Sequence, residues 1–245
     1  MKALKFVTVV VLMLVTGAFI SCDKEKNLEG EPGHIPGMGN AGGELQVIVP
    51  FVLPEGVSIV GEIRGFGDPN AAVKGDNSLL KKSMIKDGDN EYYTCGSGGQ
   101  NIILHIELRN DNEEDIDYVF EGGCLFECQQ AGCQHAICAR RVAVRLRARM
   151  SRRCKLLLYC INLGKSGSSA NLSYKILGVS KSERITKLIN ALQYKKININ
   201  DYSTDNLEEY GGMCNHIQDI VWSITNGTGV SDEDWGFINT LPNVD

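Results

Sequence analysis

The feature that most constrains the fold of this chain is a long stretch in which apolar and polar residues alternate. Between Glu44 and Asn162, short runs such as Ile102 to Arg109 place apolar side chains at every second position. A period of two puts one face of a β-strand in a core and the other in solvent. Polar turn segments separate the runs. Several short alternating strands predict an antiparallel β-sandwich over residues 44–163.

After Gly164 the apolar spacing changes to that of a helix. Apolar residues recur at helical spacing from Glu183 onward, and again in a stripe formed by Ile217, Ile220, Val221 and Ile224. Gly227 is expected to end the second helix, because glycine readily adopts the left-handed conformation found there. Ser231 and Asp234 have the spacing of a capping box. We therefore predict a small helical module over residues 164–245, and an α+β, mainly β fold class.

The first residues have the composition of a secretory signal. A basic start precedes an apolar run from Phe6 to Ile20, which is too short and too early for a stop-transfer helix. The segment Phe19-Ile20-Ser21-Cys22 resembles a bacterial lipobox, which implies a signal peptide over 1–21 and lipidation of Cys22. The implied location is the bacterial outer membrane, lipid-anchored and surface-exposed. The alternative is a plain secretory peptide with an incidental cysteine.

The segment that follows is expected to be a spacer. Residues 22–43 are charged at first and then rich in glycine and proline. Such a composition buries little apolar surface and behaves as a flexible chain. We predict a flexible tether over 22–43.

The overall charge and the motif inventory argue against several function classes. A net charge of −5 does not favour binding to nucleic acid, so no nucleic-acid partner is expected. We find no phosphate-binding loop, zinc-protease helix motif or nucleophile elbow. A hydrolase or a nucleotide-using enzyme is therefore not expected.

One strongly basic segment stands out against the acidic background. The stretch from Arg140 to Lys155 holds eight basic residues and no acidic one. Arg145, Arg147 and Arg149 fall on one strand face. We expect them to pair across strands with acidic neighbours, because opposite charges on one sheet face attract; the candidates are Glu107, Glu113, Glu114 and Asp115. The alternative is a surface that binds phosphates or acidic glycans.

The chain has nine cysteines, many for its length. If Cys22 is lipidated, eight remain, and an exported chain allows complete disulfide pairing of that number. Four of them fall within a short segment together with His135; they are Cys124, Cys128, Cys133 and Cys138. Their even spacing favours disulfides over a zinc site, which usually uses close pairs separated by a longer interval. No metal site is predicted.

Two short segments far apart in sequence carry the residue types for a covalent reaction. Tyr159-Cys160-Ile161-Asn162 closes an apolar run, and Ile217-Gln218-Asp219-Ile220-Val221-Trp222 opens a helical pattern. A thiol and a side-chain carboxamide can condense to a thioester with loss of ammonia. Gln218 lies at the flank of the apolar stripe, and Trp222 follows one turn later on the same side, where an indole can exclude water.

Two alternatives stay open for these residues. Gln218 could simply hydrogen-bond the main chain at a helix–sheet junction. Cys160 could form a disulfide, with Cys214 as its nearest candidate partner.

These two segments resemble the motifs of the bacterial surface thioester domains, over roughly residues 155–239. In that family an aromatic-Cys-aliphatic-acid/amide motif supplies the thiol, and an apolar-Gln-x-x-apolar-Trp motif supplies the acyl group. The resemblance implies that Cys160 is the thioester sulfur, Gln218 the acyl donor and Trp222 their shield. His216 is a candidate base. Ile217 departs from the family, which often has Thr before the Gln.

The resemblance also implies a function. Members of the family are adhesins, not turnover enzymes. We therefore expect a surface lipoprotein that bonds covalently to an amine of a host or neighbouring-cell surface protein. It is expected to be attached to the membrane through its lipid anchor and to need no cofactor. The alternative is a non-catalytic, disulfide-stabilised surface lipoprotein that binds a host ligand or glycan reversibly.

Overall fold

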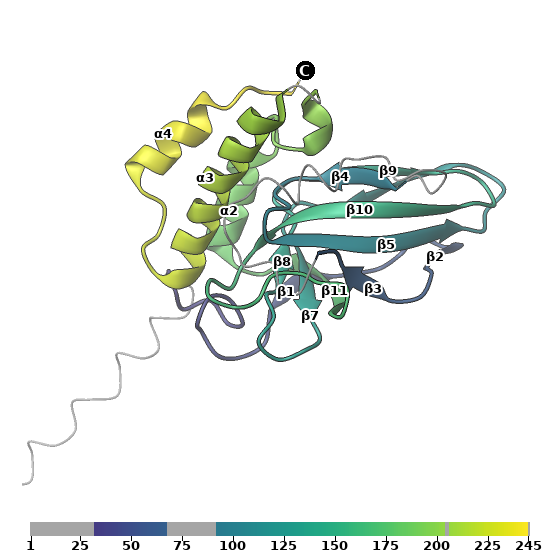
Figure 1. The fold of residues 1–245 in the computed structure, drawn as a ribbon, viewed down its shortest axis with the longest axis horizontal. Helices are drawn as coiled ribbons and strands as arrows, with labels where there is room; N and C mark the ends of the chain where they lie inside the picture. The colour runs from purple at the N-terminus through teal and green to yellow at the C-terminus, as the bar shows by residue number, and fades with distance from the viewer. Residues whose placement is uncertain (1–31, 68–91, 204–205, 245) are drawn as a thin grey trace, which may run out of the picture.

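The computed structural model describes residues 32–67, 92–203 and 206–244, and within them the protein is mainly β (Figure 1). The predicted signal peptide and Cys22 lie outside these residues. The strands are β1 (Val47–Pro50), β2 (Val57–Ile59), β3 (Ile63–Gly65), β4 (Tyr93–Gly96), β5 (Ile102–Asn110), β6 (Ile116–Phe120), β7 (Cys124–Cys128), β8 (Ala136–Ile137), β9 (Val142–Leu146), β10 (Ser151–Cys160) and β11 (Ser173–Ser180).

Six of these strands close into an antiparallel barrel, in the order β5-β3-β11-β7-β8-β10 and back to β5. The pairing of β10 with β5 closes the ring, with Leu156 opposite Leu104. The predicted β-sandwich is therefore wrong in its finer part, while the mainly β class is confirmed. The reason is physical: strands of a sandwich and of a barrel both bury one face and show the same period of two, so the pattern does not report closure.

Three of the remaining strands pair with strands of this barrel. β1 pairs with β11, β2 with β5, and β4 runs parallel to β10. β6 and β9 form a separate two-stranded antiparallel ladder. The long strands β5 and β10 therefore each pair with one strand outside the barrel, β2 and β4 respectively.

The helices follow the barrel strands in sequence and gather at one end of the barrel (Figure 1). They are α2 (Glu183–Leu192), the short 3-10 helix η2 (Ile199–Asp201), α3 (Leu207–Asn226) and α4 (Asp232–Thr240). Gly227 ends α3 in the left-handed conformation, and Ser231 caps α4 in a capping box with Asp234, as predicted. Among the helices that the structure describes, none is long and apolar enough to cross a bilayer.

The predicted helical module does not begin with a helix. Its first regular element is β11, which lies between β3 and β7 in the barrel. Strand β11 therefore shares one sheet with strands of residues 44–163. The chain is a strand up to Ser180, and the first helix begins at Glu183.

Strand β10 separates two clusters of buried side chains. Leu157, Tyr159 and Ile161 belong to the cluster that includes the buried faces of α2 and α3. Cys160 belongs to the cluster formed by the barrel strands, which Trp222 also contacts. Alternation along one strand thus places the helices on one side of β10 and the barrel core on the other.

The predicted flexible tether is wrong for its described part, residues 32–43. Ile35 and Met38 are buried in the helical cluster. Gly39 donates its backbone N–H to the carbonyl of Ile161 at 2.7 Å, and Gly33 donates to Ile224. The apolar side chains and the close approach that glycine allows attach this segment to the end of β10 and to α3.

Cysteine pairing is sparser than complete pairing would require. Cys128 and Cys133 form a disulfide. The other cysteines that the structure describes are buried and free; they are Cys95, Cys124, Cys138, Cys154, Cys160 and Cys214. Within the described ranges, no three His, Cys, Asp or Glu side chains are arranged to hold a metal ion.

Candidate functional site

The site lies where β10 ends at Cys160. On one side Cys160 pairs with Ala136 of β8. On the other side the ladder with β5 stops at the pair of Leu158 and Ile102. The main chain of Cys160 thus has no strand partner on that side, and its polar groups need partners from elsewhere because they are buried.

Gln218 of α3 supplies those partners. Its Oε1 accepts the N–H of Cys160 at 2.9 Å, and its Nε2 donates to the carbonyl of Cys160 at 2.8 Å. The carboxamide takes the place of a neighbouring strand. The side chain is 4% exposed, so the contact is shielded from water. The expected alternative, in which Gln218 binds the main chain at a helix–sheet junction, is confirmed as a contact.

The sulfur of Cys160 is fully buried and has two hydrogen-bond donors. Trp222 Nε1 lies 3.5 Å from Sγ, and the backbone N–H of Asn162 lies 3.3 Å from it. Burial raises the pKa of this thiol to about 12, although both donors act in the opposite direction. The group is therefore a neutral thiol near pH 7, held in place by the indole.

Asn162, the last residue of the first motif, joins the site to the N-terminal segment. Its Nδ2 donates to the carbonyls of Gly37 and Gly39, both at 3.1 Å, and its Oδ1 accepts the N–H of His135 at 3.0 Å. All of its side-chain polar capacity is directed at main chain. Asn162 therefore fixes residues 37–39 beside the end of β10.

A second amide reaches the same carboxamide from the start of β5. Asn101 Nδ2 donates to Gln218 Oε1 at 3.4 Å, and Asn101 is 8% exposed. No sequence motif includes Asn101. Nothing in its neighbourhood in sequence marks it, because the contact depends on how α3 packs over the barrel.

The other predicted site residues lie elsewhere. The ring of His216 stacks on Phe237 of α4 at 3.7 Å and its Nε2 lies 3.4 Å from Asp234. These contacts connect α3 to α4. Among the hydrogen bonds and ring contacts of the described residues, none joins the His216 side chain to Cys160 or Gln218, so its role as a base stays a prediction. The thiol of Cys214 accepts a hydrogen bond from Tyr159 Oη at 3.7 Å, and both Cys160 and Cys214 are free thiols, not a disulfide pair.

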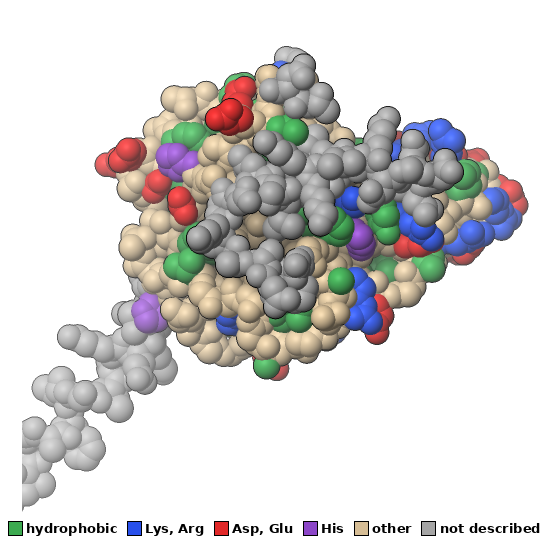
Figure 2. All heavy atoms as spheres, in the orientation of Figure 1, with side chains coloured by type: hydrophobic (Ala, Val, Ile, Leu, Met, Phe, Trp, Pro, Cys, Tyr) green, Lys and Arg blue, Asp and Glu red, His purple; other side chains and the backbone are tan. Residues whose placement is uncertain are grey.

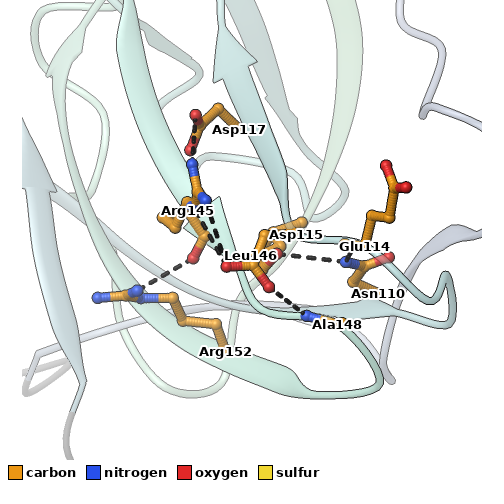
Figure 3. Close-up of polar contacts among 8 residues, drawn as sticks. All are labelled: Asn110, Glu114, Asp115, Asp117, Arg145, Leu146, Ala148 and Arg152. Atoms are coloured by element: carbon orange, nitrogen blue, oxygen red, sulfur yellow. Dashed lines mark hydrogen bonds and ion pairs between the residues drawn. The ribbon is translucent and has the colours of Figure 1, made fainter.

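Basic and acidic side chains are intermingled at the end of the molecule away from the helices (Figure 2). The basic segment does not lie there as a whole, because Arg140, its first residue, pairs with Asp201 of η2 at 2.6 Å. Arg145 pairs with Asp115 at 3.2 Å and with Asp117 at 2.9 Å (Figure 3). Arg149 pairs with Glu113, and Arg153 with Glu107. The predicted pairing with acidic neighbours is confirmed for Arg145 with Asp115 and for Arg149 with Glu113. The shared strand face is wrong, because β9 ends at Leu146 and both Arg147 and Arg149 follow it.

Comparisons with protein-family models, curated protein sequences and solved structures found no match to this chain. What the structure supplies is a set of contacts: a buried thiol, a carboxamide held against the same residue, and an indole over the sulfur.

Proposed function

We propose that this protein is a lipid-anchored surface adhesin that bonds covalently to an amine through an internal thioester between Cys160 and Gln218. The observation that supports it most directly is the pair of hydrogen bonds that holds the Gln218 carboxamide on the main chain of Cys160. Two residues separated by 58 positions are thereby fixed side by side, with the thiol on the residue that the carboxamide grips.

The proposed bond forms in one condensation. Sγ of Cys160 attacks Cδ of Gln218, and the carbon–nitrogen bond of the carboxamide breaks. The thiol proton goes to the departing nitrogen, which leaves as ammonia. A fixed geometry favours this step, because positioning turns a bimolecular reaction into an intramolecular one.

The surroundings suit a thioester that must survive in water. Cys160 and Gln218 are buried, and the Trp222 side chain, itself partly buried, contacts the sulfur. Exclusion of water slows hydrolysis of a reactive acyl group. The thioester then persists until a nucleophile of the partner attacks it.

The proposed partner group is a primary amine, such as a lysine side chain of a host or neighbouring-cell surface protein. The unprotonated amine attacks Cδ of Gln218, the carbon–sulfur bond breaks, and the sulfur takes the proton that the amine loses. The product is an amide between Gln218 and the partner and a free Cys160 thiol. Each molecule acts once, so the protein is a binder and not a turnover enzyme.

The proposed anchor is a lipid on Cys22, which would hold the protein at the bacterial outer membrane, exposed at the surface. This part of the proposal rests on the lipobox-like segment at the N-terminus. Metabolic labelling with a clickable fatty acid tests it. Incorporation should occur in the wild type and be lost in Cys22→Ser, and labelling that persists in Cys22→Ser would contradict it.

The experiment that tests the reaction is intact-mass measurement of the purified protein. The mass should be lower by one ammonia than the mass calculated for the processed, lipidated chain with the Cys128–Cys133 disulfide. Methylamine should add to Gln218 in the wild type, and not in Cys160→Ala or Gln218→Ala. The proposal would be contradicted if the wild-type protein has the calculated mass of the unreacted chain and does not take up methylamine.

A second candidate function has one observation in its favour. The carboxamide of Gln218 already satisfies the main chain of Cys160, which ties α3 to the barrel without any reaction. The protein would then be a non-catalytic surface lipoprotein that binds a host ligand or glycan reversibly. Its mass would equal that of the unreacted chain.

A further inference from the structure

Two hydrogen-bond donors converge on one oxygen of the candidate site. The N–H of Cys160 lies 2.9 Å from Gln218 Oε1, and Asn101 Nδ2 lies 3.4 Å from the same atom. The donors come from different strands, β10 and the residue just before β5. Both residues are buried, so water does not readily replace either donor.

The backbone around Asn101 is held on two sides. Its carbonyl accepts the N–H of Ser168 at 2.9 Å. Gln100, the preceding residue, donates from Nε2 to the carbonyl of Gly211 in α3 at 2.9 Å. The side chain of Asn101 is therefore presented to Gln218 by a segment docked against both the barrel and the helix.

We propose that Asn101 is a catalytic residue of this site, and that its side-chain amide and the N–H of Cys160 together form an oxyanion hole for Gln218 Oε1. This inference rests on the proposed thioester function. When a nucleophile attacks Cδ, the carbon–oxygen double bond becomes single and Oε1 takes the negative charge. Two donors directed at that oxygen stabilise the charge.

The same two donors act in both proposed reactions, thioester formation and capture of the partner amine. In thioester formation the tetrahedral intermediate collapses by expelling ammonia, which carries away the thiol proton. In capture of a partner it collapses by expelling the Cys160 sulfur, which takes the proton from the attacking amine. Oε1 carries the charge in each case, so loss of Asn101 should slow both reactions.

A purely structural role predicts something different. If Asn101 only bridges β5 to α3, its removal should lower stability and leave the reaction rate of the folded molecules unchanged. Gln100→Ala is the matched control, because it removes a neighbouring bridge between the same segment and α3 without touching Gln218.

The test is the rate at which methylamine adds to Gln218, followed by intact mass in folded protein. Wild type and Gln100→Ala should react at similar rates. Asn101→Ala should react on the order of 100-fold more slowly, the typical effect of removing one oxyanion-hole donor. Asn101→Asp keeps the shape but replaces the donor with a carboxylate oxygen, and should be at least as slow.

The outcomes separate this inference from the function on which it rests. If Asn101→Ala carries a complete thioester and reacts as fast as wild type, Asn101 is not catalytic and the thioester proposal stands. If Asn101→Ala does not fold, Asn101→Asp decides by the same comparison. If the wild type shows neither ammonia loss nor methylamine uptake, both proposals fall.

Discussion

Truncating Cys160 to alanine should cost far more stability than the loss of one buried thiol. The substitution keeps the main-chain groups that hold Gln218 and removes only the sulfur. Loss of a side-chain group of this size from a core costs about 1 kcal/mol. A thioester would also close a loop across 58 residues, and in the chain-entropy model a cross-link of that span contributes about 4 kcal/mol.

The assay is denaturant unfolding of wild type and Cys160→Ala. The expected loss is about 5 kcal/mol, with a larger m-value in the variant, because its unfolded chain is no longer cross-linked. Cys214→Ala is the matched control, since Cys214, a residue of α3, is also a buried cysteine and its thiol is free. If Cys160→Ala loses no more than about 1 kcal/mol, as expected for a thiol alone, with an unchanged m-value, the cross-link is refuted.

Three further predictions concern single residues. Trp222→Phe removes the hydrogen-bond donor to the Cys160 sulfur and part of the ring that shields it from water. The thioester should therefore be hydrolysed several-fold faster on storage, which is followed as the gain of one water in intact mass. A thioester lifetime equal to that of the wild type would contradict the shielding role. Gly39→Ala should destabilise by about 2–4 kcal/mol in thermal unfolding, because the residue has φ +56° and an added Cβ would overlap a carbonyl of α3; an unchanged midpoint would argue that residues 32–43 do not dock. Burial lowers the pKa of His105 to about 4, so the unfolded chain binds a proton that the folded one does not, and stability should fall as the pH drops from about 6.5 to about 4. His105→Asn should flatten this dependence, although not abolish it, because the pKa of His135 is lowered in the same way; an identical pH profile would show that His105 does not contribute.

Local patterns predicted much of the fold. The run from Ile102 to Arg109 matches β5 almost residue for residue, and Gly227 and Ser231 mark helix boundaries where they were expected. These features depend on neighbours in sequence, through side-chain period and capping chemistry.

Barrel closure was not predictable in the same way. It depends on β3 pairing with both β5 and β11, and on β10 pairing with β5. Those pairings join distant parts of the chain and leave no local signature. The insertion of β11 between β3 and β7 escaped the prediction of a separate helical module for the same reason.

The candidate site shows the same division. Cys160, Gln218 and Trp222 came from short motifs, and the structure brings them together. Asn101 was missed because its contact requires β5 and α3 to meet, across 117 residues. The packing of Ile35 and Met38 was missed because the segment is rich in glycine and proline, and the buried cluster that receives these two side chains exists only in the folded molecule.

The most direct test of the central claim is peptide mapping of protein that has not been exposed to methylamine. Its free thiols are alkylated under denaturing conditions before digestion. We predict one peptide that joins the segments around Cys160 and Gln218, with a mass lower than their sum by one ammonia. Recovery of two separate peptides, with an alkylated Cys160 and an unmodified Gln218 amide, would contradict the account.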